Sequence, residues 1–486
     1  MASNPQLQDR PRVLIVGGGY VGFYAAMRLQ KKIKASGGIV TVVDPLPYMT
    51  YQPFLPEVAG GNIEARHAVV SHRRHLKDTE LIDGEVVSID HKARKAFVRL
   101  SEEETIEIPY QDIIMSAGAV TKTFPIPGLA EHGIGFKTIE EAVALRNRVL
   151  EKIEEGSAEG DDPVRRRALT FVLVGGGFAG IEAIAELEDL ARAAIRRNPR
   201  MTMKDVRFVL VEAMGRVMPE VTEAQAEGVV EHLRERGIEV MLNTSLASVE
   251  DRTLKLINMP DKSPAAEFEA DTLIWTAGVR ANPLATESDF PVDDRGRIKS
   301  GADLRITGDD GPVDNAWTAG DVAAVPDLSG GGVGGYCVPN AQHAVRQAKH
   351  LAANLLAARE GQEVTDYKHT NLGAVAGFGL GKGVANVFGF GFSGLPAWLM
   401  HRAYHGTAIP TLERKLRVFS GWFWNLVLSR DTTQLEDLER PRAAFYAAAA
   451  PAKKKDDGAD KAQSSQGSKK PGEKSEVGSG SGGSAK

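Results

Sequence analysis

Residues 12–22 read RVLIVGGGYVG, an apolar run that ends in a cluster of glycines. The run has the length and β-branched content of a buried strand, and helix-forming residues follow it. Gly17, Gly19 and Gly22 match GxGxxG, in which the first glycine permits a tight turn, the second lets the backbone approach a pyrophosphate, and the third lets helix and strand pack closely. The N-terminus of the following helix offers unpaired N–H groups to phosphates. We therefore predict a dinucleotide-binding strand–turn–helix unit.

The same pattern recurs in residues 169–180, LTFVLVGGGFAG. In each copy a helix and a second apolar strand follow, and that strand ends in a carboxylate, Asp44 in the first copy and Glu212 in the second. Such an acid accepts hydrogen bonds from ribose hydroxyls, and it repels the 2′-phosphate of NADPH. We expect an α/β chain with two Rossmann-like units, of which the second prefers NADH, although the nearby Arg216 leaves NADPH as an alternative.

The composition limits the classes of protein to consider. At roughly 150 residues per domain, 486 residues suggest about three domains. The net charge of −5 argues against nucleic acid as a partner. The single cysteine, Cys337, cannot form an internal disulfide, a four-cysteine zinc site or an iron–sulfur cluster. Any redox chemistry must therefore come from a bound cofactor, and the N-terminus shows no export signal, so we expect a protein that is not secreted.

Between and after the repeats, the pattern indicates short strands, helices and one linker. From residue 371 to 400 only Lys382 is charged, but the many glycines and Pro396 favour strand, loop and helix start over a transmembrane helix. Asn340 is a plausible N-cap for the helix that follows it. The expected elements are strands within 84–90, 95–100, 104–110 and 112–118, helices at 138–155 and 340–359, and a polar linker at 155–167.

Residues 396–430 hold three of the five tryptophans of the chain. Apolar side chains recur there at helical spacing, and several arginines and lysines accompany them, which is typical of a helix lying in a membrane interface. The alternative is a helix docked on the core or on a second subunit. The apolar positions are Leu412, Leu416, Phe419, Phe423 and Leu426. From residue 441 onward the composition predicts a disordered tail.

Several motifs together resemble a known family. The two glycine motifs, the segments at 116–118 (SAG) and 276–278 (TAG), and TAGD at 318–321 resemble flavin reductases with two dinucleotide domains. Within that group, TYQPFLPEVAGG (50–61), AQHAVRQA (341–348), GKGVANVFG (381–389) and PAWLMHRAY (396–404) resemble the bacterial, single-subunit type II NADH:quinone oxidoreductases. The resemblance extends from about Arg12 to Arg430.

The resemblance implies a domain organisation and a reaction. It implies hydride transfer from NADH to non-covalently bound FAD, then two-electron reduction of a membrane quinone, with menaquinone expected and no proton pumping. The enzyme would be a homodimer held peripherally on the cytoplasmic face of the cell membrane, without a transmembrane helix. The expected domains are a discontinuous FAD domain (1–125 and 285–395), an inserted NADH domain (126–284), C-terminal membrane-anchor and dimerisation helices (396–440), and the tail (441–486).

The resemblance also assigns residues. Glu182 and Lys382 are expected to be catalytic, Glu182 by gating hydride transfer or relaying protons to quinone; alternatively Glu182 is only a favourable charge at a helix N-terminus. Lys382 is the lone charge of an apolar stretch, and such a charge must be paired or functional. The quinone site is expected to comprise Gln342, His343, Gln347 and Lys382. The FAD site is expected to comprise Gly17, Gly18, Gly19, Tyr20, Val21, Gly22, Asp44, Pro45, Tyr51, Gln52, Val86, Ala117, Gly118, Gly320, Asp321, Ala341 and Gln342. The NADH site is expected to comprise Gly175, Gly177, Phe178, Ala179, Gly180, Glu182, Glu212, Ala277 and Gly278. His72 and His75 are interpreted as part of a solvated loop, and no metal is assigned.

Other functions of the same fold stay open. Disulfide, CoA-disulfide and peroxide reductases need a redox-active cysteine near the flavin, and residues 48–50 (YMT) offer none. Sulfide:quinone reductases need at least two cysteines. A reductase of ferredoxin or oxygen remains an alternative, as does a membrane-associated redox sensor resembling apoptosis-inducing flavoproteins.

Overall fold

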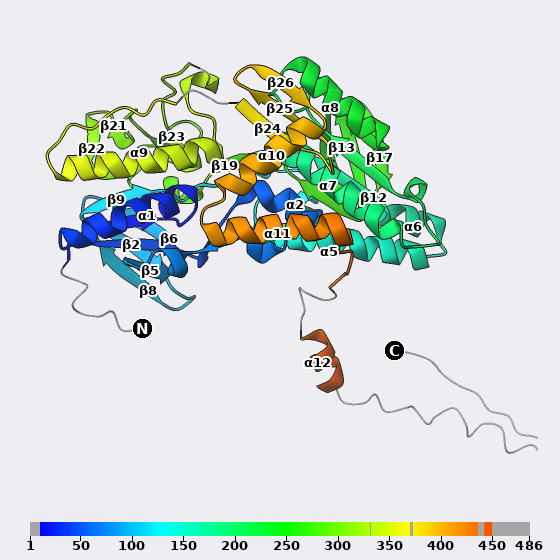
Figure 1. The fold of residues 1–486 in the computed structure, drawn as a ribbon, viewed down its shortest axis with the longest axis horizontal. Helices are drawn as coiled ribbons and strands as arrows, with labels where there is room; N and C mark the ends of the chain where they lie inside the picture. Colours follow the sequence, from blue (N-terminus) through cyan, green and yellow to red (C-terminus); the bar gives the residue numbers. More distant parts are fainter. Residues whose placement is uncertain (1–9, 331, 370–372, 436–441, 450–486) are drawn as a thin grey trace, which may run out of the picture. The chain divides into compact units, whose positions relative to one another are not determined.

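The computed structural model describes residues 10–330, 332–369, 373–435 and 442–449. The chain divides into two units, residues 1–435 and residues 436–486. Of the second unit the structure describes one helix, α12 (Ala443–Ala449). The remainder of the predicted tail from residue 450, and residue 441, lie outside the described residues. The first unit contains both glycine motifs and the helices α1 to α11 (Figure 1).

The first glycine motif follows β1, an interior strand of a six-stranded sheet with the order β21-β22-β9-β1-β2-β5. All neighbours pair in parallel except β21 and β22, which are antiparallel. The central strands are continuous apolar runs because both faces of the sheet are covered. Its strands are β1 (Arg12–Val16), β2 (Ile39–Asp44), β5 (Thr79–Asp83), β9 (Asp112–Met115), β21 (Arg305–Gly308) and β22 (Gly311–Thr318).

The two faces of this sheet are covered differently. Helices α1 (Tyr20–Ala35) and α9 (Ala341–Arg359) pack against one another, as Figure 1 shows. An antiparallel meander shares a second apolar core with the sheet, in which Val86 and Ile89 meet Leu14 and Val16. The meander comprises β6 (Glu85–Asp90), β7 (Lys95–Arg99) and β8 (Thr105–Pro109), which confirms the predicted strands.

The second glycine motif lies in a five-stranded, wholly parallel sheet with the order β11-β18-β12-β13-β14. A second meander completes this unit, so the repeat seen in the sequence is a repeat of architecture. The strands are β11 (Gly133–Gly135), β12 (Thr170–Val174), β13 (Arg207–Val211), β14 (Ile238–Met241) and β18 (Thr272–Trp275), and those of the meander are β15 (Thr244–Glu250), β16 (Thr253–Asn258) and β17 (Pro264–Glu269). The helices are α5 (Ile139–Ala158), α6 (Asp162–Ala168), α7 (Phe178–Ile195) and α8 (Glu223–Glu235).

The linker predicted at 155–167 is wrong. Helix α5 continues to Ala158, and α6 begins at Asp162, so only three residues separate them. Pro163 stands in the first turn of α6, where its missing N–H has no cost. The polar residues that suggested a linker instead stabilise the helices, because Glu155 pairs with Lys152 and Arg167 pairs with Asp271.

The chain passes between the sheets twice, and the two passages lie side by side. β10 (Ala119–Thr121) leaves the first sheet and β19 (Val279–Ala281) returns to it, and the two strands pair antiparallel. This arrangement supports an inserted second domain, and the exact boundaries remain a prediction. Helices α2 (Leu55–Ala59), α5 and α7 pack together, so the two nucleotide units share one large core.

The C-terminal part begins with a three-stranded antiparallel sheet, β24 (Gly373–Gly377), β25 (Gly383–Val387) and β26 (Phe390–Ser393). Helix α10 (Leu395–Ala408) packs on it, and α11 (Leu412–Leu428) follows after a tight connection. The prediction of strand, loop and helix start in the uncharged stretch is confirmed. None of the helices in the described ranges is both long and apolar enough to span a bilayer.

The remaining short elements connect these parts. They are β3 (Tyr48–Thr50), β4 (Val69–Ser71), β20 (Ile298–Lys299), β23 (Ala323–Ala324), α3 (His72–His75), α4 (Leu129–His132) and the 3₁₀ turns η2 (Gln52–Phe54), η3 (Ala65–His67), η4 (Met203–Asp205), η5 (Pro283–Ala285), η6 (Gly320–Val322) and η7 (Val333–Gly335).

Candidate functional site

The first glycine loop has the geometry that a pyrophosphate requires. Gly17 adopts φ +92°, a conformation that L side chains rarely take. A Cβ on Gly22 would lie 1.8 Å from the carbonyl oxygen of Gly17, so any side chain there would separate α1 from β1. At Gly19, by contrast, a Cβ would meet no described atom within 4 Å. That open space lies before the N-terminus of α1, where the phosphates of FAD fit.

The second loop repeats these three roles. Gly175 has φ +118°, and a Cβ on Gly180 would lie 1.9 Å from the carbonyl oxygen of Gly175. A Cβ on Gly177 would again meet nothing described within 4 Å. The second loop therefore offers a second dinucleotide the same space before α7.

The two predicted acids hold their own loops. Asp44 accepts the N–H of Gly18 at 2.6 Å, and Glu212 accepts the N–H of Gly176 at 2.5 Å. The other oxygen of each carboxylate accepts an N–H two residues further along, at 2.7 Å in both cases. Burial raises the pKa of Asp44, which the N–H of Gly18 partly offsets. Each acid lies beside its phosphate space, and the ribose contact remains a prediction.

The second (S/T)AG segment mirrors the first. The hydroxyl of Ser116 donates to the carbonyl of Val16 at 2.8 Å, and that of Thr276 donates to the carbonyl of Val174 at 3.0 Å. These bonds fix the predicted cofactor residues 117–118 and 277–278 at the ends of the central strands. A side chain on Gly118 or Gly278 would meet open space.

His72 is buried, and its interpretation as part of a solvated loop is wrong. Its exposed fraction is 3%, and its Nε2 lies 2.8 Å from the carbonyl oxygen of Gly18. Burial lowers the pKa of His72. The ring of His72 therefore packs against the backbone of the first glycine loop. Within the part of the chain that the structure describes, no group of three or more His, Cys, Asp or Glu residues could hold a metal ion.

The TAGD segment and the start of α9 form the wall of one cavity. Gly320 has φ +76°, and its N–H donates to Gln347 Oε1 at 2.8 Å. Asn340 caps α9, as predicted, by accepting the N–H of His343 at 2.8 Å. The cavity is lined by Arg297, Gly320, Asp321, Ala323, Val325, Cys337, Val338, Pro339, Asn340, His343 and Gln347.

Asp321 faces a lysine that the sequence did not single out. Burial raises the pKa of Asp321, and Lys137 partly offsets this from 3.9 Å. The Lys137 Nζ also lies 3.5 Å from Gln52 Oε1, so it joins two predicted FAD residues. A carboxylate, a cation and a first turn with free N–H positions at Ala341 and Gln342 suit the ribityl chain and pyrimidine edge of FAD.

The predicted quinone residues of α9 already have partners. Gln347 is fully buried and holds Gly320, while His343 Nδ1 lies 3.0 Å from the hydroxyl of Tyr367. Gln342 Oε1 lies 2.9 Å from His369 Nε2. His343 and Gln347 line the first cavity, and their contact with quinone remains a prediction.

The lone thiol also lines this cavity. Burial raises the pKa of Cys337 to about 11, to which the charge of Asp327 contributes. The sulfur donates to the carbonyl oxygen of Pro326 at 3.6 Å. At neutral pH the thiol is therefore protonated and poorly nucleophilic.

A second cavity surrounds Glu182. Its carboxylate accepts the N–H of Gly377 at 3.0 Å and lies 3.2 Å from His401 Nε2. Helix α10 closes the cavity from one side, which the sequence did not predict. The lining residues are Pro53, Pro56, Glu57, Glu182, Glu186, Gly377, Trp398, His401 and Arg402.

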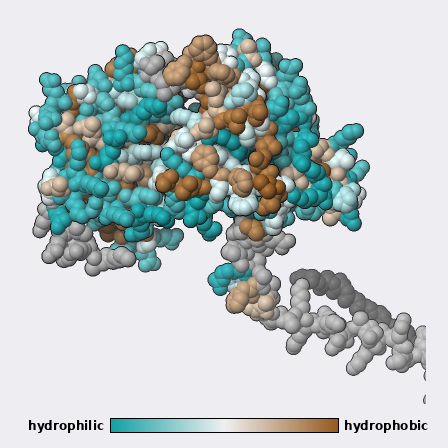
Figure 2. Space-filling view, in the orientation of Figure 1, coloured by the Kyte–Doolittle hydropathy of each residue, from teal (hydrophilic) through white to brown (hydrophobic). Residues whose placement is uncertain are grey.

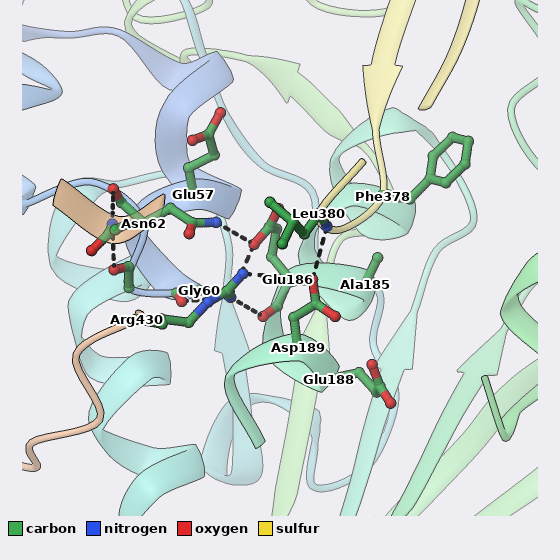
Figure 3. A network of polar contacts seen from close by, with 12 residues as sticks. Glu57, Gly60, Asn62, Ala185, Glu186, Glu188, Asp189, Phe378, Leu380 and Arg430 are labelled. Atoms are coloured by element: carbon green, nitrogen blue, oxygen red, sulfur yellow. Dashed lines mark hydrogen bonds and ion pairs between the residues drawn. The ribbon is translucent and has the colours of Figure 1, made fainter. Parts of the chain in front are cut away.

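The carboxylates of this cavity have separate partners. Glu57 pairs with Arg402 at 3.4 Å and accepts the indole N–H of Trp422 at 2.5 Å. Glu186 accepts from the side-chain amide of Asn62 at 2.7 Å and pairs with Arg430 at 3.1 Å (Figure 3). Burial raises the pKa of Glu186 to about 7, against the lowering effect of Arg430.

Lys382 does not join either cavity. It lies in the turn between β24 and β25 and is exposed to solvent. The local apolarity of the sequence therefore does not place Lys382 in a buried environment, and of the two expected outcomes, a paired or a functional charge, the functional one stays a prediction. Its catalytic role remains a prediction without support from the geometry.

The other predicted residues differ in placement. Tyr20 and Tyr51 lie beside the first loop with ring centroids 6.0 Å apart, and Val21 contacts Gly320. Val86 is buried in the core of the first sheet, whereas Pro45 and Ala179 are exposed. Phe178 is partly buried at the start of α7.

Comparison with known proteins agrees with this geometry. A type II NADH:quinone oxidoreductase of Staphylococcus haemolyticus is 28% identical over 83% of this chain and 96% of its own length. The type II NADH:quinone oxidoreductase Ndh of Mycobacterium tuberculosis is 28% identical over 85% of this chain and 87% of its own length.

The fold is also that of a solved structure. NDH2 from Plasmodium falciparum in complex with NADH superimposes with a TM-score of 0.80 at 18% identity, covering 87% of this chain and 100% of the other. The family model for pyridine nucleotide-disulphide oxidoreductases matches residues 11–348, which include both glycine loops and the start of α9. The chain therefore belongs to the pyridine nucleotide-disulphide oxidoreductase family.

Proposed function

We propose that this chain is an FAD-dependent NADH:quinone oxidoreductase of type II. The observation that carries the proposal is the pair of matching glycine loops in a chain whose only thiol is solitary and protonated. Electrons from a nicotinamide cannot pass to a disulfide within this chain, so they must leave through another acceptor. The similar proteins from Staphylococcus and Mycobacterium bear the name type II NADH:quinone oxidoreductase.

The residues have two roles: some bind the two dinucleotides, and others stabilise the charge that develops on the cofactor. When bound, FAD supplies the chemistry of accepting a hydride and returning two electrons. The first loop, Asp44 and Asp321 hold that cofactor, and the N-terminus of α9 presents N–H groups to its pyrimidine edge. The second loop and Glu212 hold NADH, and the carboxylate of Glu212 favours NADH over NADPH.

Membrane attachment through the C-terminal helices is part of the proposal. Figure 2 shows apolar side chains gathered over α10, α11 and the β25–β26 hairpin. Large exposed apolar side chains there include Phe388, Phe390, Leu395, Leu399, Leu412, Leu416, Phe423, Trp424, Leu426, Val427 and Leu428. A contiguous patch of this kind marks an interaction site, and a lipophilic quinone must be met at a bilayer. We also propose peripheral attachment at the cytoplasmic face, a homodimer, menaquinone as substrate and no proton pumping.

Stopped-flow kinetics tests the reaction. NADH should bleach the flavin absorbance of the full-length holoprotein, and a menaquinone or ubiquinone analogue should restore it much faster than oxygen or ferredoxin does. Restoration by quinone no faster than by oxygen would contradict the proposal. Faster restoration by ferredoxin or oxygen would indicate the corresponding reductase, and slow restoration by all acceptors would indicate a redox sensor.

A further inference from the structure

Two histidines on α10 continue a row of titratable side chains that begins at Glu182. His401 and His405 are one helical turn apart and so lie on the same face, with ring centroids 4.6 Å apart. His401 Nε2 lies 3.2 Å from Glu182 Oε1, and His405 Nδ1 lies 3.1 Å from the hydroxyl of Tyr51. The row Glu182–His401–His405–Tyr51 thus crosses from α7, under α10, to the segment beside the first glycine loop.

The surroundings of His401 leave Glu182 as its partner. The ring is 4% exposed and lies against the backbone of β24, where a Cβ on Gly377 would be 3.2 Å from Nδ1. The other charged groups that face it are Glu57 of α2 and Arg402 of its own helix, and these two pair with each other.

The charge states of the row differ from one member to the next. Burial alone would lower the pKa of His401, but the ion pair with Glu182 and the charge of Glu57 raise it above the ordinary histidine value, against Arg402. Burial holds the pKa of His405 well below that value, and the charge on His401 lowers it further. Burial raises the pKa of Tyr51 as well. An imidazole with a raised pKa therefore stands between a carboxylate and an imidazole with a lowered pKa, and a neutral imidazole can both accept and donate a proton.

We propose that His401, recharged through His405, supplies through Glu182 the proton that quinone reduction consumes. The inference rests on the proposed quinone reductase activity. In the overall reaction, NADH + H⁺ + quinone gives NAD⁺ + quinol, so the hydride accounts for two electrons and one proton, and a second proton must be delivered. The N–H bond of the His401 imidazolium breaks, an O–H bond of the quinol forms by way of Glu182, and water returns the proton through His405.

The two ends of the row fit this direction of transfer. Glu182 and His401 line the second cavity, and their side chains are 11% and 6% exposed. His405 is partly exposed and stands next to Tyr404, which is 40% exposed. Proton uptake at His405 and delivery at Glu182 follow from this gradient of exposure. His401 is accordingly a positioning residue that acts through Glu182.

Replacing the imidazole and comparing two acceptors tests the relay. A soluble quinone analogue takes up electrons and protons, whereas ferricyanide takes up electrons alone. In the full-length holoprotein, His401→Gln should lower the ratio of quinone to ferricyanide turnover by at least about tenfold, a conservative share of what a positioned acid contributes. Wild-type quinone turnover should fall as pH rises through the raised pKa of His401, and His401→Gln should abolish that fall.

A control and a second variant complete the test. His132→Gln, on the exposed end of α4, should change neither the ratio nor the pH profile. If His401→Gln loses its flavin, His405→Gln decides by the same ratio and profile, since residue 405 is less buried than residue 401. Equal losses with both acceptors, or an unchanged ratio and profile, would overturn the relay while leaving the proposed function intact. A wild-type protein that reduces ferricyanide but not quinone would overturn the proposed function and the relay with it.

Discussion

Glycines that occupy neighbouring positions of the same loop are required for different reasons. Gly180 is needed by the fold, because its Cβ position lies 1.9 Å from a backbone oxygen. Gly177 is not needed by the fold, because a Cβ there would meet open space and its backbone has an ordinary φ of −71°. A methyl group at Gly177 would nevertheless stand where the phosphates of a dinucleotide approach.

Gly177→Ala should therefore separate binding from stability. We expect the KM for NADH to rise at least about tenfold. The free energy of unfolding should change by no more than a neutral surface substitution would cause, about 0.5 kcal/mol. Steady-state kinetics with ferricyanide and thermal unfolding would measure the two effects. Gly228→Ala in α8, which also faces open space, is the matched control and should leave KM unchanged. An unchanged KM in Gly177→Ala would contradict the placement of NADH on the second loop.

Single residues show where sequence reasoning succeeds and fails. The positions of Asp44 and Glu212 beside the two glycine loops could be predicted because each stands at a fixed local position at a strand end, whereas their ribose contacts stay predictions. The position of His72 could not be predicted, because its partner Gly18 is 54 residues away. The pair of Glu182 and His401 is likewise formed only by tertiary packing. The exposure of Lys382 could not be predicted, because local apolarity does not reveal that a turn is exposed.

At the level of elements, α11 is apolar on two faces rather than one. Val418 and Trp422 dock it onto the core, and Trp422 also donates to Glu57. The residues that the sequence singled out for a membrane face, such as Leu416 and Phe423, stay 62% and 56% exposed. The helical period was readable from the sequence, but which stripe docks and which remains outside depends on the packing of α2 and α10.

Negative charges at the exposed apolar positions of α11 should release the protein from lipid without unfolding it. We expect Leu416→Glu combined with Phe423→Glu to lower the partition onto anionic liposomes at least about tenfold, because burying each side chain contributes about 1.5–3 kcal/mol and about 1.4 kcal/mol is a factor of ten. Liposome sedimentation would measure the partition. Leu100→Glu, an exposed apolar position after β7, is the control and should have no effect. Undiminished sedimentation of the double variant would argue that α11 binds a protein instead.

At the scale of the whole first unit, the repeat in the sequence predicted two Rossmann-like units, whereas the insertion of the second unit in the first was implied only by the family resemblance. The repeat did not predict which contacts hold the C-terminal segment against the two nucleotide units. Arg430 follows α11 and binds the carbonyl of Gly60 at 2.7 Å and that of Glu186 at 3.0 Å (Figure 3). A single arginine carries no periodicity, so no pattern could have indicated this role.

Arg430→Ala should be costly, and more so at high pH than at low pH. Removing one partner of a buried ion pair costs about 3–5 kcal/mol, and the side chains of Arg430 and Glu186 are 10% and 6% exposed. Glu186 has a pKa of about 7 in the folded protein against 4.5 ordinarily, so the stability linked to its proton is present below 4.5 and lost as pH rises through 7. Without Arg430 this folded pKa rises further, so the deficit of the variant should grow between pH 5 and pH 8.

Thermal unfolding of the FAD-loaded protein at pH 5 and pH 8 distinguishes the buried contacts of Arg430 from an ordinary surface ion pair. Arg417→Ala is the control, because Arg417 is 51% exposed and pairs with Glu413 on the same helix, and such pairs contribute about 0–1 kcal/mol. We expect a large fall in the thermal midpoint for Arg430→Ala at pH 8, a smaller fall at pH 5, and little change for the control. Equal falls at the two pH values would mean that Arg430 acts through its bonds to the carbonyl groups of Gly60 and Glu186 rather than through the charge of Glu186. Hydrogen bonds to backbone carbonyl groups would then hold the C-terminal helices against the nucleotide units, independently of the charge of the carboxylates around Glu182.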